Sequence, residues 1–101
     1  MLEEIIMHAR VILGKVKHDK QDEAIKIYKE SVEPTAKAQK GFKRMHLLTD
    51  PDTNKFISIT IWETESDMIT SESSGYLQEQ LDKIAALFVG PPSIQHYIIS
   101  N

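Results

Sequence analysis

The chain has 101 residues, of which 41% are apolar and 27% are charged, and its formal net charge is −3. This length suits a single domain over residues 1–101, and the negative charge without a basic stripe argues against nucleic-acid binding. The chain has no cysteine, which excludes disulfides and thiolate metal sites.

The start of the chain and its longest apolar run predict a cytoplasmic protein that does not enter a membrane. The sequence opens with Met1-Leu2-Glu3-Glu4, which is acidic where a signal peptide would be basic. The longest apolar run, residues 84–89, has six residues and is far too short to span a bilayer.

The first third of the chain predicts a strand followed by a helix. Residues 6–16 alternate with the period of a strand, with Arg10 and Ile12 on one face and Ala9 and Val11 on the other. The sequence leaves two interpretations of Arg10 open. It is either solvated or buried, and a buried arginine would need an acidic partner. An apolar stripe over residues 19–38 predicts a helix.

Pro34 should kink or interrupt this helix, because proline lacks an N–H group and clashes with the preceding turn.

The middle of the chain predicts two strands joined by a turn. Residues 42–49 form the first, with Phe42, Arg44 and His46 on one face. Residues 50–54 are rich in turn formers, and residues 55–62 then alternate as another strand.

The last third predicts two helices and a final strand. Thr64, with Asp67 three residues later, is typical of a helix start. Residues 71–75 read as a loop that could act as a mobile lid. A helical stripe follows over residues 77–88, and residues 94–100 alternate as a strand.

The order of elements is β-α-β-β-α-β, which predicts an α+β, ferredoxin-like fold with a four-stranded antiparallel sheet. Two helices can cover only one face of this sheet, yet both faces of the strand over residues 55–62 are apolar. Ile57, Ile59 and Ile61 lie on one face, and Phe56 and Trp62 lie on the other. We therefore expect a homodimer in which the isoleucine faces of two sheets meet.

Several short motifs resemble the antibiotic biosynthesis monooxygenase (ABM) family, whose members are dimeric α/β barrels. They are Pro34 near the end of the first helix, Gly41-Phe42, and the segment Trp62-Glu63-Thr64. The resemblance covers nearly the whole chain, and it implies the fold more specifically than the reaction.

The resemblance implies a cleft between sheet and helices. In family members with a known site the tryptophan faces this cleft, and the resemblance therefore implies that the cleft side carries Trp62, Thr60, Ser58 and Phe56. The resemblance also implies that haem degradation is disfavoured, because the haem-degrading branch of the family ligates iron through a histidine on the helical segment after the tryptophan, and this chain has no histidine between His46 and His96. Ser58 occupies the position where the quinone-forming branch can carry an asparagine.

Catalytic and binding roles can be proposed for a few residues. His46 is the candidate general base, because the pKa of histidine lies near the working pH. Phe42 and Arg44 share its predicted strand face, and Tyr76 follows the predicted lid. A surface histidine and a solvated arginine on an edge strand remain the alternatives. The histidine spacing predicts no metal site.

The leading interpretation is a monooxygenase-like oxidoreductase that needs no cofactor and binds a small, largely apolar or aromatic substrate. Ser58 and Thr60 would hydrogen-bond the substrate, and Trp62 would stack on it. The alternative is a non-catalytic ligand-binding or stress-response module of the same fold, and haem binding is a third, less favoured class. A cleft filled by the protein's own side chains, and not an open cavity of about 300 Å³ or more, would favour the alternative.

Overall fold

The computed structural model describes residues 6–101, so the acidic start over residues 1–4 lies outside it. Four strands form one sheet in the order β2-β3-β1-β4, and all neighbouring strands are antiparallel. The strands are β1 (His8–Lys15), β2 (Phe42–Asp50), β3 (Lys55–Trp62) and β4 (Ser93–Ile98). This topology confirms the predicted ferredoxin-like α+β fold.

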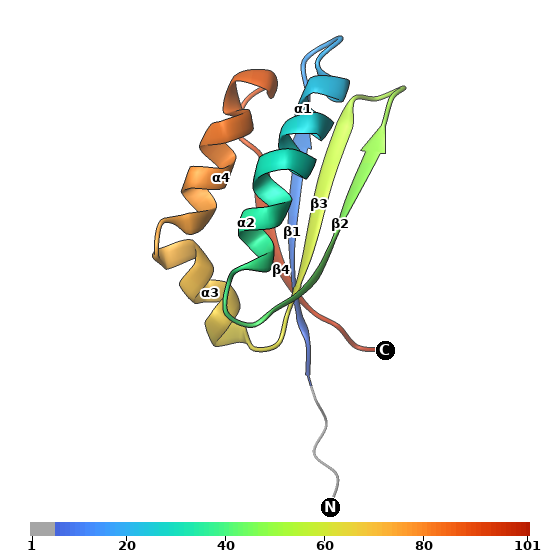
Figure 1. Cartoon of the computed structure of the whole chain (residues 1–101). Helices are drawn as coiled ribbons and strands as arrows, with labels where there is room; N and C mark the ends of the chain where they lie inside the picture. Colours follow the sequence, from blue (N-terminus) through green and yellow to red (C-terminus); the bar gives the residue numbers. More distant parts are fainter. Residues whose placement is uncertain (1–5) are drawn as a thin grey trace, which may run out of the picture.

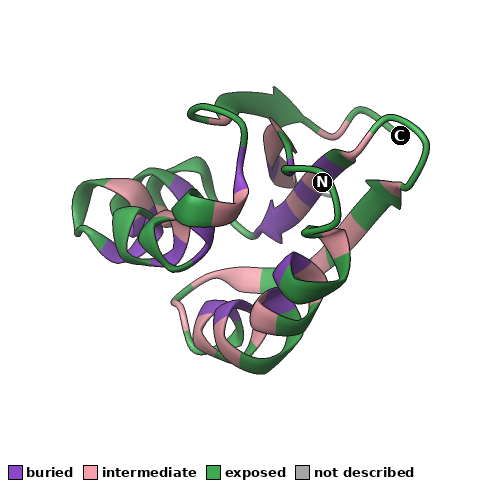
Figure 2. Cartoon of the chain, turned by 90° about the horizontal axis from the view of Figure 1, so that it is seen from above, coloured by how far each residue is buried: buried purple, intermediate pink, exposed green. Residues whose placement is uncertain are grey.

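The helices lie together on one face of the sheet (Figure 1). The first helical run consists of α1 (Gln21–Ile27), the π-helical turn η1 (Tyr28–Val32) and α2 (Glu33–Lys37). The second helical run consists of α3 (Glu65–Ser73), α4 (Tyr76–Ile84) and the 3₁₀ turn η2 (Ala85–Leu87). Seen from above, buried residues gather where these helices meet the sheet (Figure 2).

The interruption predicted at Pro34 takes the form of the π-helical turn. Proline cannot donate the hydrogen bond that a regular helix requires at this position. The N–H of Glu33 bonds to the carbonyl of Tyr28, five residues earlier, and the Thr35 hydroxyl donates to the carbonyl of Ser31 at 2.9 Å. The helix therefore continues past Pro34 with one widened turn, and Tyr28 begins that turn.

The predicted lid is instead part of a helix. The N-cap at Thr64 is confirmed, since its side chain accepts a hydrogen bond from the Asp67 N–H at 3.0 Å. The helix continues through Ser73, and only Ser74 and Gly75 connect it to α4. Ser71 fits inside α3 because its hydroxyl donates to the carbonyl of Met68 at 2.6 Å.

A β-bulge changes the faces predicted for β2. Phe42 pairs with Trp62, but Arg44 pairs with Ile61, so Lys43 is the extra residue. Phe42 therefore shares the helix-covered face with Trp62. Arg44, His46 and Leu48 lie on the opposite face of the sheet. The prediction that Arg44 and His46 share a face is confirmed, but the prediction that Phe42 shares it with them is wrong for this reason.

The core fills the space between the helices and the sheet. The ring of Phe56 packs edge-to-face on Tyr28 and Phe88, with centroids 6.0 and 5.4 Å away. Gly14 makes room for the second of these rings, because a Cβ built on Gly14 would lie 2.2 Å from the Phe88 ring. A side chain at position 14 would therefore displace Phe88.

The opposite face of the sheet carries no helix in the described part of the chain (Figure 1). Apolar side chains line it on every strand: Val11, Leu13, Ile57 and Ile59 are half-buried, and Leu48 and Tyr97 are exposed. Among residues 6–101 no helix is long and apolar enough to cross a membrane.

Candidate functional site

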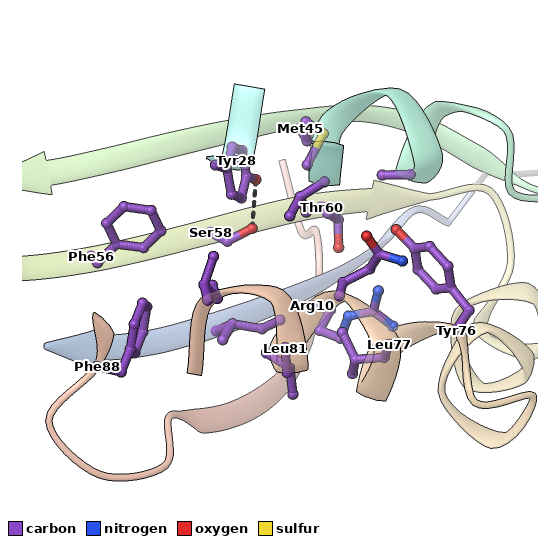
Figure 3. Close-up of a pocket in the computed structure, with 15 residues that line it drawn as sticks. Arg10, Tyr28, Met45, Phe56, Ser58, Thr60, Tyr76, Leu77, Leu81 and Phe88 are labelled. Atoms are coloured by element: carbon purple, nitrogen blue, oxygen red, sulfur yellow. Dashed lines mark hydrogen bonds between the residues drawn. The ribbon is translucent and has the colours of Figure 1, made fainter. Parts of the chain in front are cut away.

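A small cavity lies between the sheet and the helices (Figure 3). Phe56 and Phe88 stand at one end, Arg10 and Tyr76 stand at the other, and Ser58 lies between them. Its volume is about 40 Å³. A cavity of about 150 Å³ holds benzene, and one water needs roughly 10–15 Å³. In this conformation the cavity therefore admits a few water-sized groups and no complete ring.

Tyr28 and Ser58 form a buried hydroxyl pair over the middle of the cavity. Their oxygens are 2.7 Å apart, and either can be the donor. Two hydroxyl hydrogens are present and the pair uses one, so one remains for a third partner. Burial raises the pKa of Tyr28 to about 12. Its phenol therefore stays protonated near neutral pH and can only donate or accept a hydrogen bond in its neutral form.

Trp62 packs behind the cavity and is not one of the residues that line it. Its side chain is 0% exposed, and its indole N–H donates to Thr60 Oγ1 at 2.8 Å. The ring packs edge-to-face on Phe42, with centroids 5.9 Å apart. The structure therefore places Trp62 in the core, where it orients Thr60, which does line the cavity.

Arg10 brings a guanidinium group to the polar end of the cavity, although it is only 2% exposed. Its Nη1 donates to Ser71 Oγ at 2.7 Å, to the Met68 carbonyl at 3.3 Å and to Glu72 Oε2 at 3.2 Å. Its carbon Cζ lies 5.0 Å from the Trp62 ring centroid, a cation–π distance. Burial lowers the pKa of Arg10, and the hydrogen bond to Glu72 opposes this effect.

One buried guanidinium nitrogen has no hydrogen-bond partner among residues 6–101. Arg10 Nε is buried and forms no hydrogen bond with any residue of the described chain. On the outer side, Glu72 Oε2 also lies 2.7 Å from His96 Nε2. The Arg10 guanidinium is thus held through Nη1 from α3, and its Nε remains unpaired.

The structure brings together only some of the predicted site residues. Ser58, Thr60 and Tyr76 line the cavity. Arg44 and His46 are exposed on the opposite face of the sheet, where their strand partners are Ile61 and Ile59. The predicted base and arginine are therefore separated from the cavity by the sheet itself.

Arg10, Tyr28 and Gln80 line the cavity as well, although their sequence context does not predict a site role for them. Arg10 shares its strand face with the apolar Ile12, and Tyr28 lies within an apolar helix stripe. Polar groups on apolar faces signal buried hydrogen bonds, but their partners depend on a strand register that the sequence does not show. Among residues 6–101, no group of three or more His, Asp or Glu side chains is placed to hold a metal ion.

Comparison with known proteins places the chain in a family. Residues 7–82 match the family described as "Antibiotic biosynthesis monooxygenase". No curated protein sequence matches the chain.

Solved structures share the fold at low sequence identity. A monooxygenase from the gene ActVA-Orf6 of Streptomyces coelicolor, in complex with nanaomycin D, aligns with a TM-score of 0.80 and 14% identity over 98% of this chain and 92% of that one. A mutant form of SnoaB, a cofactor-independent oxygenase from Streptomyces nogalater, aligns with a TM-score of 0.71 and 18% identity over 94% and 92%.

A conserved protein from Methanosarcina mazei aligns with a TM-score of 0.75 and 16% identity over 92% of both chains. These likenesses concern the fold, whereas the sequence match over residues 7–82 concerns the family. The chain belongs to the antibiotic biosynthesis monooxygenase family.

Proposed function

We propose that the chain is a monooxygenase-like enzyme that acts on a small, largely apolar or aromatic substrate in the cavity between sheet and helices, and that this cavity of about 40 Å³ widens when the substrate binds. One observation carries this proposal: the cavity is apolar at the Phe56–Phe88 end and lined by hydrogen-bond donors at the other. Such a lining suits a flat apolar molecule with an oxygen at one end. Family membership supports oxygenation as the reaction class.

The overall reaction would convert a substrate methylene and O₂ into a carbonyl and water. The methylene gives up a proton to water as the substrate binds, and the resulting carbanion gives one electron to O₂. The substrate radical and superoxide then combine into a peroxide anion, which takes up a proton to become a hydroperoxide and loses water to leave the carbonyl. Ser58, Thr60 and Tyr76 would hold the substrate oxygen while the closed cavity excludes solvent. His46 lies outside this cavity, so it has no part in this scheme as a base.

The test is oxygen uptake with a small phenolic ketone that has one aromatic ring and an acidic methylene. Ala36 lines the cavity and is buried, so Ala36→Leu fills the space and should lower kcat/KM by about tenfold or more. Ala38→Leu, at the exposed C-cap of the same helical run, is the matched control. Equal rates for the two variants, or no uptake by the wild type, would refute the proposal.

A second candidate function is a non-catalytic ligand-binding module. The volume of about 40 Å³ favours it over the enzyme, because substrate pockets usually measure about 300–1,000 Å³ and this cleft is largely filled by the protein's own side chains. If a phenolic ligand binds and the Ala36→Leu substitution weakens this binding while no oxygen is consumed, the binding module is the correct assignment.

We also propose that the chain forms a homodimer through the open face of its sheet, centred on Ile57, Ile59 and Ile61. The apolar side chains along this face support the proposal, because monomeric proteins rarely expose a continuous apolar surface of this kind. Dimeric α/β barrels are also the form that the family resemblance implies.

A further inference from the structure

We propose that Arg10 forms the binding site for an anionic oxygen, so that the cavity selects phenolates or enolates over neutral analogues of the same shape. This inference rests on the proposed function, and it names the class of substrate that the cavity would take.

The first support is the unpaired nitrogen. Arg10 is 2% exposed, and its Nε is buried without a hydrogen-bond partner among residues 6–101. Buried polar atoms in folded proteins are nearly always paired. A guanidinium group has only donors, so the missing partner must be an acceptor. Arg10 lines the cavity, and a ligand there is one source of that acceptor.

The second support is the inventory of the other lining groups. Tyr28 and Ser58 keep one hydroxyl hydrogen beyond their mutual bond. Thr60 Oγ1 accepts from Trp62 and still carries its own hydrogen. Gln80 uses its oxygen to accept from Lys83 Nζ at 2.9 Å, which leaves its amide N–H groups. The polar lining therefore offers mainly donors.

The lining also contains no competing negative charge. None of the cavity-lining residues in the described chain is Asp, Glu or His. A donor-rich, weakly solvated site stabilises an electron-rich oxygen more than a neutral one. A substrate that binds as its anion needs no protein base inside the cavity, which agrees with the position of His46 on the other face of the sheet.

A substitution of Glu72 should change anion binding in the opposite direction to a substitution of Arg10, and this provides a second test. Its carboxylate partly neutralises Arg10 through Nη1, at 3.2 Å, and is shared with His96. The other titratable groups near Arg10 are Tyr28 and Tyr76. If Arg10 binds an anion, removing the charge of Glu72 while keeping an acceptor should strengthen anion binding. If Arg10 serves only to hold α3 against β1, the same change should not improve binding.

The experiment measures binding of nitrophenol, whose anion absorbs visible light, and of its neutral methyl ether, nitroanisole. In the wild-type protein we expect binding to lower the apparent pKa of nitrophenol by about one unit, a tenfold preference for the anion. Arg10→Met should abolish this shift, and Glu72→Gln should enlarge it. Lys55→Met, which removes an exposed charge from β3, should leave it unchanged.

The outcomes separate the inference from the proposed function. If nitroanisole binds as tightly as nitrophenol at every pH, the anion site is refuted while the cavity remains a binding site. If neither probe binds, both proposals fail. Should Arg10→Met not fold, as judged by circular dichroism, Glu72→Gln decides alone: an enlarged shift supports the inference, and an unchanged or smaller one overturns it.

Discussion

At the residue scale, Tyr28 takes part in a helix turn, a hydrogen bond and an aromatic contact. The widened turn before Pro34 begins at Tyr28, its phenol pairs with Ser58 at 2.7 Å, and its ring packs on Phe56. Because burial penalises the phenolate, the pKa of Tyr28 is raised to about 12. The free energy of unfolding must therefore depend on pH in the alkaline range.

We predict that wild-type stability falls more steeply than that of Tyr28→Phe as the pH rises from 10 toward 12. The pKa of tyrosine is 10.0 ordinarily and about 12 at this position, so between these values the unfolded chain has lost a proton that the folded chain keeps. The contribution is fully present below pH 10 and lost above 12, and it amounts to about 2–3 kcal/mol.

Urea denaturation at a series of pH values measures this difference directly. Tyr76, whose pKa burial also raises to about 12, is present in both proteins and cancels in the comparison. Parallel stability curves for the two proteins would show that the phenol of Tyr28 ionises normally in the folded state.

Arg10 and His46 show what the sequence can and cannot predict about a site. Strand alternation assigns each to one of two faces, but it cannot say which residues from other elements arrive there. The unpaired Nε of Arg10 depends on how α3 packs over β1. That packing follows from the whole fold, so a cluster such as Arg10 with Ser71 and Glu72 is invisible in the linear order.

At the scale of elements, α3 supplies the hydrogen-bond acceptors of Arg10 Nη1. Ser71, Glu72 and the carbonyl of Met68 all come from this helix. Its start is fixed by Thr64, whose side chain satisfies the N–H of Asp67. A substitution at the start of α3 should therefore alter the position of Arg10 at the cavity, although Thr64 itself is exposed.

We predict that Thr64→Ala lowers the free energy of unfolding by about 1 kcal/mol, the usual cost of losing an N-cap. Amide hydrogen exchange should accelerate in residues 65–73 more than in the strands, because the helix end loses a hydrogen bond. Thr64→Ser keeps the capping oxygen and should behave like the wild type. Unchanged exchange in α3 after Thr64→Ala would contradict this prediction.

The strands also explain where sequence patterns succeed and fail. Alternation predicts β3 correctly, because it pairs with β1 without interruption over its whole length. It fails in β2 because the bulge at Lys43 shifts the alternation by one residue. The composition of Gly41-Phe42-Lys43-Arg44 carries no signal for a bulge, so the side on which Arg44 and His46 lie could not be predicted.

At the scale of the whole molecule, the order of elements was enough to predict the ferredoxin-like topology, since few arrangements join a β-α-β-β-α-β chain without crossing connections. The uncovered apolar face then raises the question of assembly. Half-buried Ile59 lies on that face, on β3, which is one of the two inner strands of the sheet.

We predict that Ile59→Lys converts the protein from dimer to monomer, because a charge would be buried at the centre of the proposed interface. Light scattering coupled to size exclusion at micromolar concentration measures the mass. Ile69→Lys introduces the same change at a side chain that is 42% exposed on α3 and should remain dimeric. A monomeric wild type would refute the proposed assembly.

The ring of Phe88 has a consequence for how this protein could diverge from its relatives. With Leu81 and Ile84 it lines both the inner cavity and an outer groove of about 500 Å³ between α4 and β4. These side chains form a partition between two volumes, and the absence of a side chain at Gly14 lets the ring of Phe88 fit there. A shorter residue at position 88 would join the volumes and admit larger ligands while leaving every donor in place. In the proposed site, ligand size and ligand charge would therefore depend on different residues, and a substitution that alters one need not alter the other.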